Sequence, residues 1–353
     1  MAASHGPGSR VTQAEVARAA GVSVGAVSQV LNDNPTSRIS EEVRERILAA
    51  ASALGYRPNM VARTLRTSES RTYGFVSDTV TITRFASGIL RGALDAAHES
   101  GYLLLIAETA GDAARETEAV QALLDRGVDG IVFTAVKSRY SGTLGMGLSV
   151  PCVNVNIADA DAPSILPDEL AGGRLAVRAL AEAGHRHGIA LVGHDFRSDI
   201  DTGIALTGRR RLDGIAAEMA SVGIDFLDQQ ACGDWQTDEG YAAAHRMISN
   251  RGVTALLCLN DRLAFGAYQA LAEAGLRIPD DVSVMSFDDE ELAASLRPGL
   301  TTVAIPHETM GALAIEMLRT PGPAESDVLV PMSLHERVSV TAPAPHRAGA
   351  TPH

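Results

Sequence analysis

Side chains suited to holding a small polar ligand stand out in the second half of the 353-residue chain. Arg211 carries a planar fork of N–H donors, which suits vicinal hydroxyls or a carboxylate. Asn260, Asp261 and Asp288 each come at the end of an apolar run of strand length. Because ligands of α/β sheets bind beyond the carboxyl ends of strands, these side chains could meet one ligand. The alternative for Arg211 is a surface ion pair within the run 209–211.

Patterns typical of enzymes and metal sites are weak in this chain. His185 and His187 have the spacing of a ligand pair, but no further His/Cys cluster accompanies them. Gly184-His185 more simply ends a helix before the next strand. The sequence holds no Gly-x-Ser-x-Gly elbow and no phosphate loop. We therefore expect no catalytic residues, no metal and no cofactor.

Two short helices joined at Gly21 are predicted for the stretch 11–32. Thr12 and Glu15 have the spacing of a capping box, and Ser23 can cap the second helix. A turn residue with positive φ is cheapest as glycine, which suits Gly21. In the second helix Val27 and its apolar neighbours face inward, so the polar and small residues face outward.

The outer face of that second helix carries Val24, Gly25, Ser28 and Gln29. Two short helices at a glycine turn form the helix-turn-helix pattern, which places its second helix in the DNA major groove. The alternative is a small helical hairpin inside a larger core. Charge favours DNA: residues 1–71 hold nine Arg and six acids, a net +3, against −16 for the rest of a chain of −13.

A third helix is predicted from Ser40 to about residue 54, followed by a short helix over residues 58–66. The short helix is marginal alone in water, and Leu65 could wedge between base steps in the minor groove. The alternative is an ordinary interdomain helix.

From Thr72 onward, apolar runs alternate with helical stretches, which predicts parallel sheets covered by helices. The rhythm occurs twice, so we expect two lobes with a cleft between them. Residues 1–10 lack the apolar core of a signal peptide, and no run approaches the roughly 18 residues of a membrane span. Three scattered cysteines fit a reducing cytoplasm.

Together these patterns resemble the lactose-repressor (LacI/GalR) family of bacterial transcription regulators, over about residues 11–340. The matching motifs are Val16-Ala-Arg-Ala-Ala-Gly-Val-Ser23, Val27-Ser28, Gly55-Tyr-Arg-Pro-Asn59, Ala62-Arg-Thr-Leu-Arg66, Gly184-His185, Arg211-x-x-Gly214, Asn260-Asp261 and Ser286-Phe-Asp-Asp289. The resemblance implies a helix-turn-helix headpiece and hinge helix, then a two-lobed periplasmic-binding-protein-like α/β domain with parallel sheets. It also implies a cytoplasmic, nucleoid-associated homodimer on pseudo-palindromic operator DNA, acting as a repressor that a sugar effector controls.

The resemblance assigns two groups of site residues. The DNA-contacting group is Thr12, Ser23, Val24, Gly25, Ala26, Ser28, Gln29, Asn32, Tyr56, Asn59, Ala62, Arg63 and Leu65. The effector-binding group is Phe85, Arg211, Trp235, Asn260, Asp261 and Asp288. Trp235 matches an aromatic residue that stacks on sugar rings in some relatives, with core packing as its alternative.

The implied domains are a disordered N-terminus (1–10), a DNA-binding domain (11–57), a hinge (58–70), an effector and dimerisation domain (71–340) and a disordered tail (341–353). Within the effector domain we expect an N-lobe of about 72–183 plus 304–327, and a C-lobe of about 184–301 plus 328–340.

The chain departs from the family pattern in informative places. Gln29 stands where many relatives have Arg; Gln can pair bidentately with adenine, whereas Arg prefers guanine. The tail lacks the leucine heptads that make the lactose repressor a tetramer, so we expect a dimer. The alternatives to a regulator are a solute-binding protein of a transporter and a sugar-processing enzyme.

Overall fold

The computed structural model describes residues 11–31, 39–57, 69–79, 83–140, 147–158, 162–198, 206–249, 252–320 and 327–344. The chain divides into two compact units, residues 1–70 and 71–353. No helix in the described ranges is long and apolar enough to cross a membrane.

The first unit is built from α1 (Gln13–Ala20), α2 (Val24–Leu31) and α3 (Glu41–Ala53). The predicted capping box at Thr12 is confirmed, with both of its hydrogen bonds present. Gly21 is left-handed at φ 65°, and Ser23 Oγ accepts from Ala26 N at 3.2 Å. These local bonds end one helix and begin the next within four residues, which determines the angle between them.

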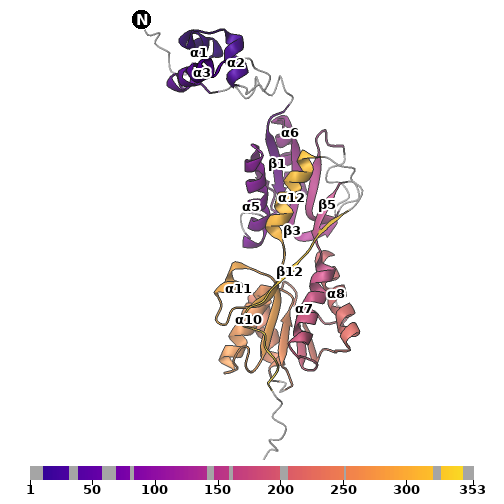
Figure 1. Ribbon diagram of the computed structural model, residues 1–353. Coiled ribbons are helices and arrows are strands. Elements are labelled where there is room, and N and C mark those ends of the chain that lie inside the picture. Colours follow the sequence, from indigo (N-terminus) through magenta and orange to yellow (C-terminus); the bar gives the residue numbers. More distant parts are fainter. Residues whose placement is uncertain are drawn as a thin grey trace, which may run out of the picture. The chain divides into compact units, whose positions relative to one another are not determined.

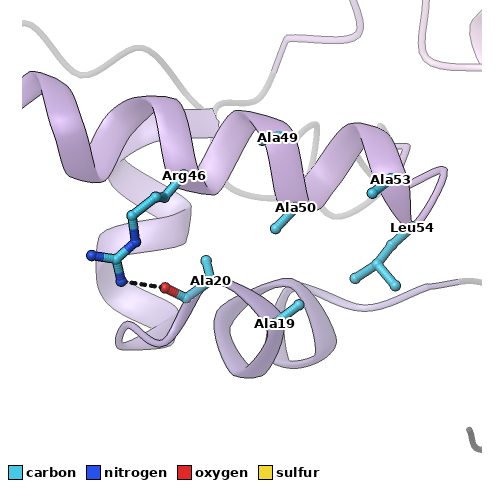
Figure 2. Close-up of a pocket in the computed structure, with 7 residues that line it drawn as sticks. All are labelled: Ala19, Ala20, Arg46, Ala49, Ala50, Ala53 and Leu54. Carbon is cyan, nitrogen blue, oxygen red and sulfur yellow. Dashed lines mark hydrogen bonds between the residues drawn. The ribbon is translucent and has the colours of Figure 1, made fainter.

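Small residues of α1 and α3, mostly alanines, line a shallow pocket between these helices (Figure 2). Val16, Val27 and Ile47, one from each helix, are fully buried in the shared core. Arg46 on α3 donates from Nη2 to the carbonyl of Ala20 at 2.6 Å. A cation at the carboxyl end of α1 also complements the helix dipole.

The second unit contains two six-stranded sheets (Figure 1). The first sheet has the order β11-β5-β4-β3-β1-β2 and the second the order β12-β10-β9-β8-β6-β7. The strands of the first are β1 (Thr72–Ser77), β2 (Leu103–Glu108), β3 (Gly130–Tyr140), β4 (Cys152–Ala158), β5 (Ser164–Pro167) and β11 (Val328–Val330). Those of the second are β6 (Ile189–Gly193), β7 (Asp228–Ala231), β8 (Ala255–Cys258), β9 (Ser283–Asp288), β10 (Thr301–Ala304) and β12 (Ser333–His335). All pairings are parallel except that of β10 with β12.

Helices cover both sheets. The first sheet packs with α5 (Arg84–Glu99), α6 (Ala113–Asp125) and α12 (His307–Arg319), and the second with α7 (Glu169–Glu182), α9 (Thr237–Met247) and α10 (Asp261–Glu273). Helices α8 (Leu206–Val222) and α11 (Glu291–Ser295) contribute to the core of the second lobe, and α8 also contacts β3 of the first sheet. In Figure 1 the late helix α12 lies among the early elements of the first lobe. Consecutive residues of β1 face opposite sides of the sheet: Phe75 packs with α5 and α12, and Val76 packs with α6.

The lobe boundaries differ from those we expected in two places. Helix α7, assigned by sequence to the first lobe, packs on α8 and contributes Ala176 and Leu180 to the core of the second lobe. Strand β11, assigned to the second lobe, pairs with β5 in the first sheet. The chain therefore passes between the lobes after β5, after β10 and between β11 and β12.

The first residue of the expected disordered tail is bound to the core. The carbonyl of Thr341 lies 2.9 Å from Nε2 of the fully buried His185, and Thr341 N donates to Ser283 Oγ at 3.2 Å. Burial lowers the pKa of His185, which keeps it a neutral hydrogen-bonding group. His185 is thus a core residue after the end of α7, as expected from Gly184-His185.

Glycines permit a close contact between α7 and α8 in the second lobe. A Cβ on Gly173 of α7 would lie 2.9 Å from Ile215 N and still closer to the carbonyl of Arg211, both on α8. Gly214 on α8 faces the backbone of Leu170 in the same way. Because backbone meets backbone here, α8 is held against the start of α7.

Candidate functional site

Arg211 is the centre of a buried polar cluster in the second lobe. Its side chain is 4% exposed, and it donates from Nε to Glu169 Oε2 and from Nη2 to Glu169 Oε1, each at 2.7 Å. A longer bond of 3.4 Å runs from Nη2 to Asp288 Oδ1. Nη1 donates to the carbonyl of Leu259, and the guanidinium lies 4.4 Å from the ring centroid of Phe287. Arg211 is therefore in a buried ion pair instead of the surface pair considered from sequence.

Four separate elements bring this cluster together. Arg211 comes from the first half of α8, Glu169 begins α7, Leu259 follows β8 and Asp288 ends β9. Strands β8 and β9 are adjacent and parallel, so their carboxyl ends meet at one edge of the sheet. Arg211 and Asp288, which the family resemblance assigns to the effector, therefore lie together at this edge.

Sequence reasoning missed Glu169, which is 1% exposed. It precedes Arg211 by 42 positions and lies in the first turn of α7, next to Asp168, which caps that helix through Ala171 N. An acidic residue in a first helical turn is common and favourable for the helix dipole. Nothing in the local pattern distinguishes it from a capping residue.

Asp288 has unusual backbone and electrostatic surroundings. Its φ is 105°, a conformation rare for a residue with a side chain, and the side chain is 9% exposed. Burial raises the pKa of Asp288 to about 7; the charge of Arg211 lowers it, while Glu169 and Glu290 raise it. This carboxyl is therefore poised between its neutral and ionised forms near neutral pH.

Asn260 and Asp261 differ from expectation because their side chains make internal bonds. Asn260 caps α10 by accepting from Leu263 N at 2.9 Å. Asp261 is fully buried and accepts from Thr302 Oγ1 at 2.9 Å, from Glu290 N at 2.6 Å, and from Ser286 Oγ. Its place in the interior leaves Asp261 no surface for a ligand, so its role is to join β8, β9 and β10.

Trp235 is half-buried at the same edge of the sheet. Its Nε1 donates to the carbonyl of Gly193 at 3.1 Å, and its own carbonyl accepts from Asn260 Nδ2 at 3.1 Å. It also packs against the core of the second lobe. The structure thus brings Trp235 to the ends of β6 and β8, between core and edge.

His307 shows that the Arg211 cluster lies near the junction of the lobes. It begins α12, which packs on α5 of the first lobe, and it follows the chain crossing after β10. Burial and the charge of Arg211 lower the pKa of His307 to about 4. Within the first lobe, Asp78 follows β1 and accepts from Val136 N at 3.1 Å. Phe85 lies on α5, but its side chain is outside the described residues.

The candidate DNA face is formed by the exposed side of α2 and the residues before it. Ser23, Val24, Gly25 and Gln29 are exposed, whereas Val27 and Val30 are buried. Of the other predicted contacts, Thr12 is exposed, and Ala26, Ser28 and Tyr56 are half-buried. Asn32, Asn59, Ala62, Arg63 and Leu65 lie outside the described residues.

A three-helix unit with an exposed second helix, joined to a two-sheet unit with a polar cluster at its strand ends, defines a ligand-responsive DNA-binding regulator. Residues 12–59 match the family model of bacterial regulatory proteins, lacI family, and residues 177–340 match a periplasmic binding protein-like domain. The chain is 32% identical over 311 residues to the ribose operon repressor of Haemophilus influenzae, covering 87% of this chain and 90% of that one. It is 33% identical over 313 residues to the ribose operon repressor of Escherichia coli strain K12, covering 87% and 92%. The chain belongs to the lacI family of bacterial regulatory proteins.

Solved structures agree. The lac repressor dimer bound to operator and an anti-inducer has a TM-score of 0.74 and 28% identity, covering 95% of this chain and 100% of that one. Membership of a family of DNA-binding regulators decides against the transporter and enzyme alternatives. Among the described residues, no group of three or more His, Cys, Asp or Glu side chains could hold a metal ion.

Proposed function

We propose that this protein is a transcriptional repressor that binds pseudo-palindromic operator DNA as a homodimer, with an affinity controlled by a sugar bound between its lobes. The observation that carries the proposal is the presence, in one chain, of the exposed α2 face and the Arg211–Asp288 cluster. Relatives named ribose operon repressors make a pentose the first effector to test. Because its target is DNA, we place its action in the cytoplasm, at the nucleoid.

The effector would contact Arg211, Asp288 and Trp235 from the second lobe and Phe85 from the first. Residues 58–66 would form the hinge helix, with Leu65 as the wedge in the minor groove. A ligand can change DNA affinity only through its differential affinity for two arrangements of the lobes. This hinge lies outside the described residues and stays a prediction.

A direct test is to select a binding site from random DNA and titrate it with the protein, with and without D-ribose and other neutral sugars. Specific binding should be orders of magnitude tighter than binding to random DNA. It should weaken steeply between ~50 and ~200 mM salt, because phosphate contacts release counterions. One sugar should change the operator affinity. Equal affinity for selected and random DNA would reject the proposal.

Replacing Gln29 by Arg should change the preferred half-site from adenine towards guanine. Gln29 is exposed on α2, and Gln and Arg prefer these different bases in bidentate contacts worth ~1–3 kcal/mol. Site selection with the wild type and Gln29→Arg measures the change. The matched control is Gln13→Arg, which adds the same charge on α1. Identical selected sites for wild type and Gln29→Arg would show that Gln29 reads no base.

A dimer surface is suggested by apolar side chains at the edge of the first sheet. Strand β2 is an edge strand, and Leu103 and Ile106 on it are 72% and 45% exposed. Leu94 on the neighbouring α5 is 41% exposed. Apolar groups gathered on an exposed edge commonly mark an interface.

Leu103→Lys should therefore convert the dimer to a monomer with little loss of stability, since the side chain is exposed within the single chain. Sedimentation equilibrium gives the mass, and thermal unfolding checks the fold. Leu292→Lys, on a side chain 47% exposed in the second lobe, is the control. A Leu103→Lys protein that stays dimeric would place the interface elsewhere.

A further inference from the structure

The positive charge of Arg211 is fully neutralised inside the protein. Glu169 binds it through two parallel bonds of 2.7 Å, and both side chains are almost completely buried. Asp288 adds a second carboxyl at 3.4 Å. Two carboxyls thus face one guanidinium, so the cluster has a charge of −1 when Asp288 is ionised and zero when it is protonated.

The neighbouring charged groups do not reverse this balance. Glu290 is paired with Arg262 at 2.9 Å, which adds no net charge. His307 is neutral at pH 7, because burial and Arg211 hold its pKa near 4. Burial raises the pKa of Asp261 to about 8, and this carboxyl is either neutral or negatively charged, so it supplies no positive charge. None of these groups supplies the positive surplus that a buried anion requires.

The cluster retains hydrogen-bonding capacity for a neutral ligand. Arginine has five N–H donors, and the bonds to Glu169, Asp288 and Leu259 use four of them. Within the described residues, Asp288 Oδ2 has no hydrogen-bond donor. An unused donor and an unused acceptor in one cluster match hydroxyl groups, which both accept and donate.

We propose that Glu169 is a specificity-determining residue that makes this site select uncharged, hydroxyl-rich effectors and reject sugar acids and sugar phosphates. It acts by orienting the Arg211 guanidinium and cancelling its charge, so it is a positioning residue and need not touch the effector. The proposal rests on the proposed effector site. An anion entering this site would lose its hydration without meeting a free positive charge, because Glu169 already binds both Nε and Nη2 of Arg211, and that cost provides the discrimination.

The test compares wild type, Glu169→Gln and the control Glu182→Gln, which removes an exposed carboxylate from the same helix. The probes are three neutral sugars, D-ribose, D-glucose and D-galactose, and, for each sugar, the corresponding aldonic acid and terminal phosphate ester. Binding is measured as the shift in the melting temperature of the protein. For wild type and Glu182→Gln, at least one neutral sugar should raise the melting temperature and no anion should. Glu169→Gln should gain stabilisation by an acid or phosphate, with at least a tenfold tighter dissociation constant by calorimetry.

Stabilisation of the wild type by an anionic probe would overturn the proposal, as would a folded Glu169→Gln that gains none. If Glu169→Gln does not fold, Asp288→Asn decides: it keeps the Glu169–Arg211 pair, so it should still reject the anions, and anion binding there would transfer the role to Asp288. Operator titration of the sugar-free wild type is a separate readout. Its failure would reject the regulator function, whereas failure in the anion arm alone rejects only the role of Glu169.

Discussion

Arg211→Met is expected to lower the free energy of unfolding of the second unit by ~3–5 kcal/mol, because it leaves Glu169 as a buried carboxylate without its partner. The double variant Glu169→Met with Arg211→Met should recover much of that loss, since an apolar pair of similar size can replace a buried ion pair. Both proteins should lose the response to effector. Operator binding should persist, because residues 1–70 have their own hydrophobic core.

Urea unfolding measures this effect, and Arg209→Met, on an exposed side chain of the same helix, is the control. A single variant as stable as the double variant would contradict the coupling between Arg211 and Glu169.

The dependence of stability on pH provides a second test. The folded protein holds the Asp288 proton up to about pH 7, well above the ordinary carboxyl value, so this group's contribution to stability falls as pH rises from ~4 to ~7. The fall should extend to higher pH in Arg211→Met, where the cation that lowers this pKa is gone.

Gly173→Val is expected to disrupt the site without touching a charged side chain. Its Cβ would overlap the backbone carbonyl of Arg211, and backbone cannot move aside as the end of a flexible side chain can. Helix α8 must therefore shift away from α7, which separates Arg211 from Glu169. Overpacking of this kind typically costs ~1–3 kcal/mol, to which the weakened ion pair adds.

Calorimetric unfolding and sugar titration of Gly173→Val measure both consequences. Ala171→Val, on an exposed position of α7, controls for the lower helix propensity of valine. We expect Gly173→Val to lose both stability and effector affinity, while Ala171→Val retains them. Unchanged effector affinity in Gly173→Val would mean that the position of Arg211 does not depend on the contact between α7 and α8.

The sequence alone determined the features that depend on neighbours within a few positions. The capping box at Thr12, the turn at Gly21 and the buried Val27 follow from spacings of three or four residues, and the structure shows all three. The βα rhythm predicted two lobes with parallel sheets, whereas it was the resemblance to the family that assigned Arg211 and Asp288 to one site. Order and spacing of motifs along the chain were also enough to indicate the family.

Only the tertiary structure decided which charges are paired and which are buried. Glu169 meets Arg211 because α7 crosses to the second lobe and two glycines let α8 approach it, and neither event has a local pattern. Asp261 resembles a ligand residue at a strand end, yet its carboxyl lies inside the protein beneath β9 and β10. The pairing of β11 with β5 in the first sheet cannot be predicted from a three-residue apolar run either. In each case the partner lies tens of residues away along the chain. Which side chains touch is therefore determined by how strands and helices are arranged in space, and not by the spacing of residues in the sequence.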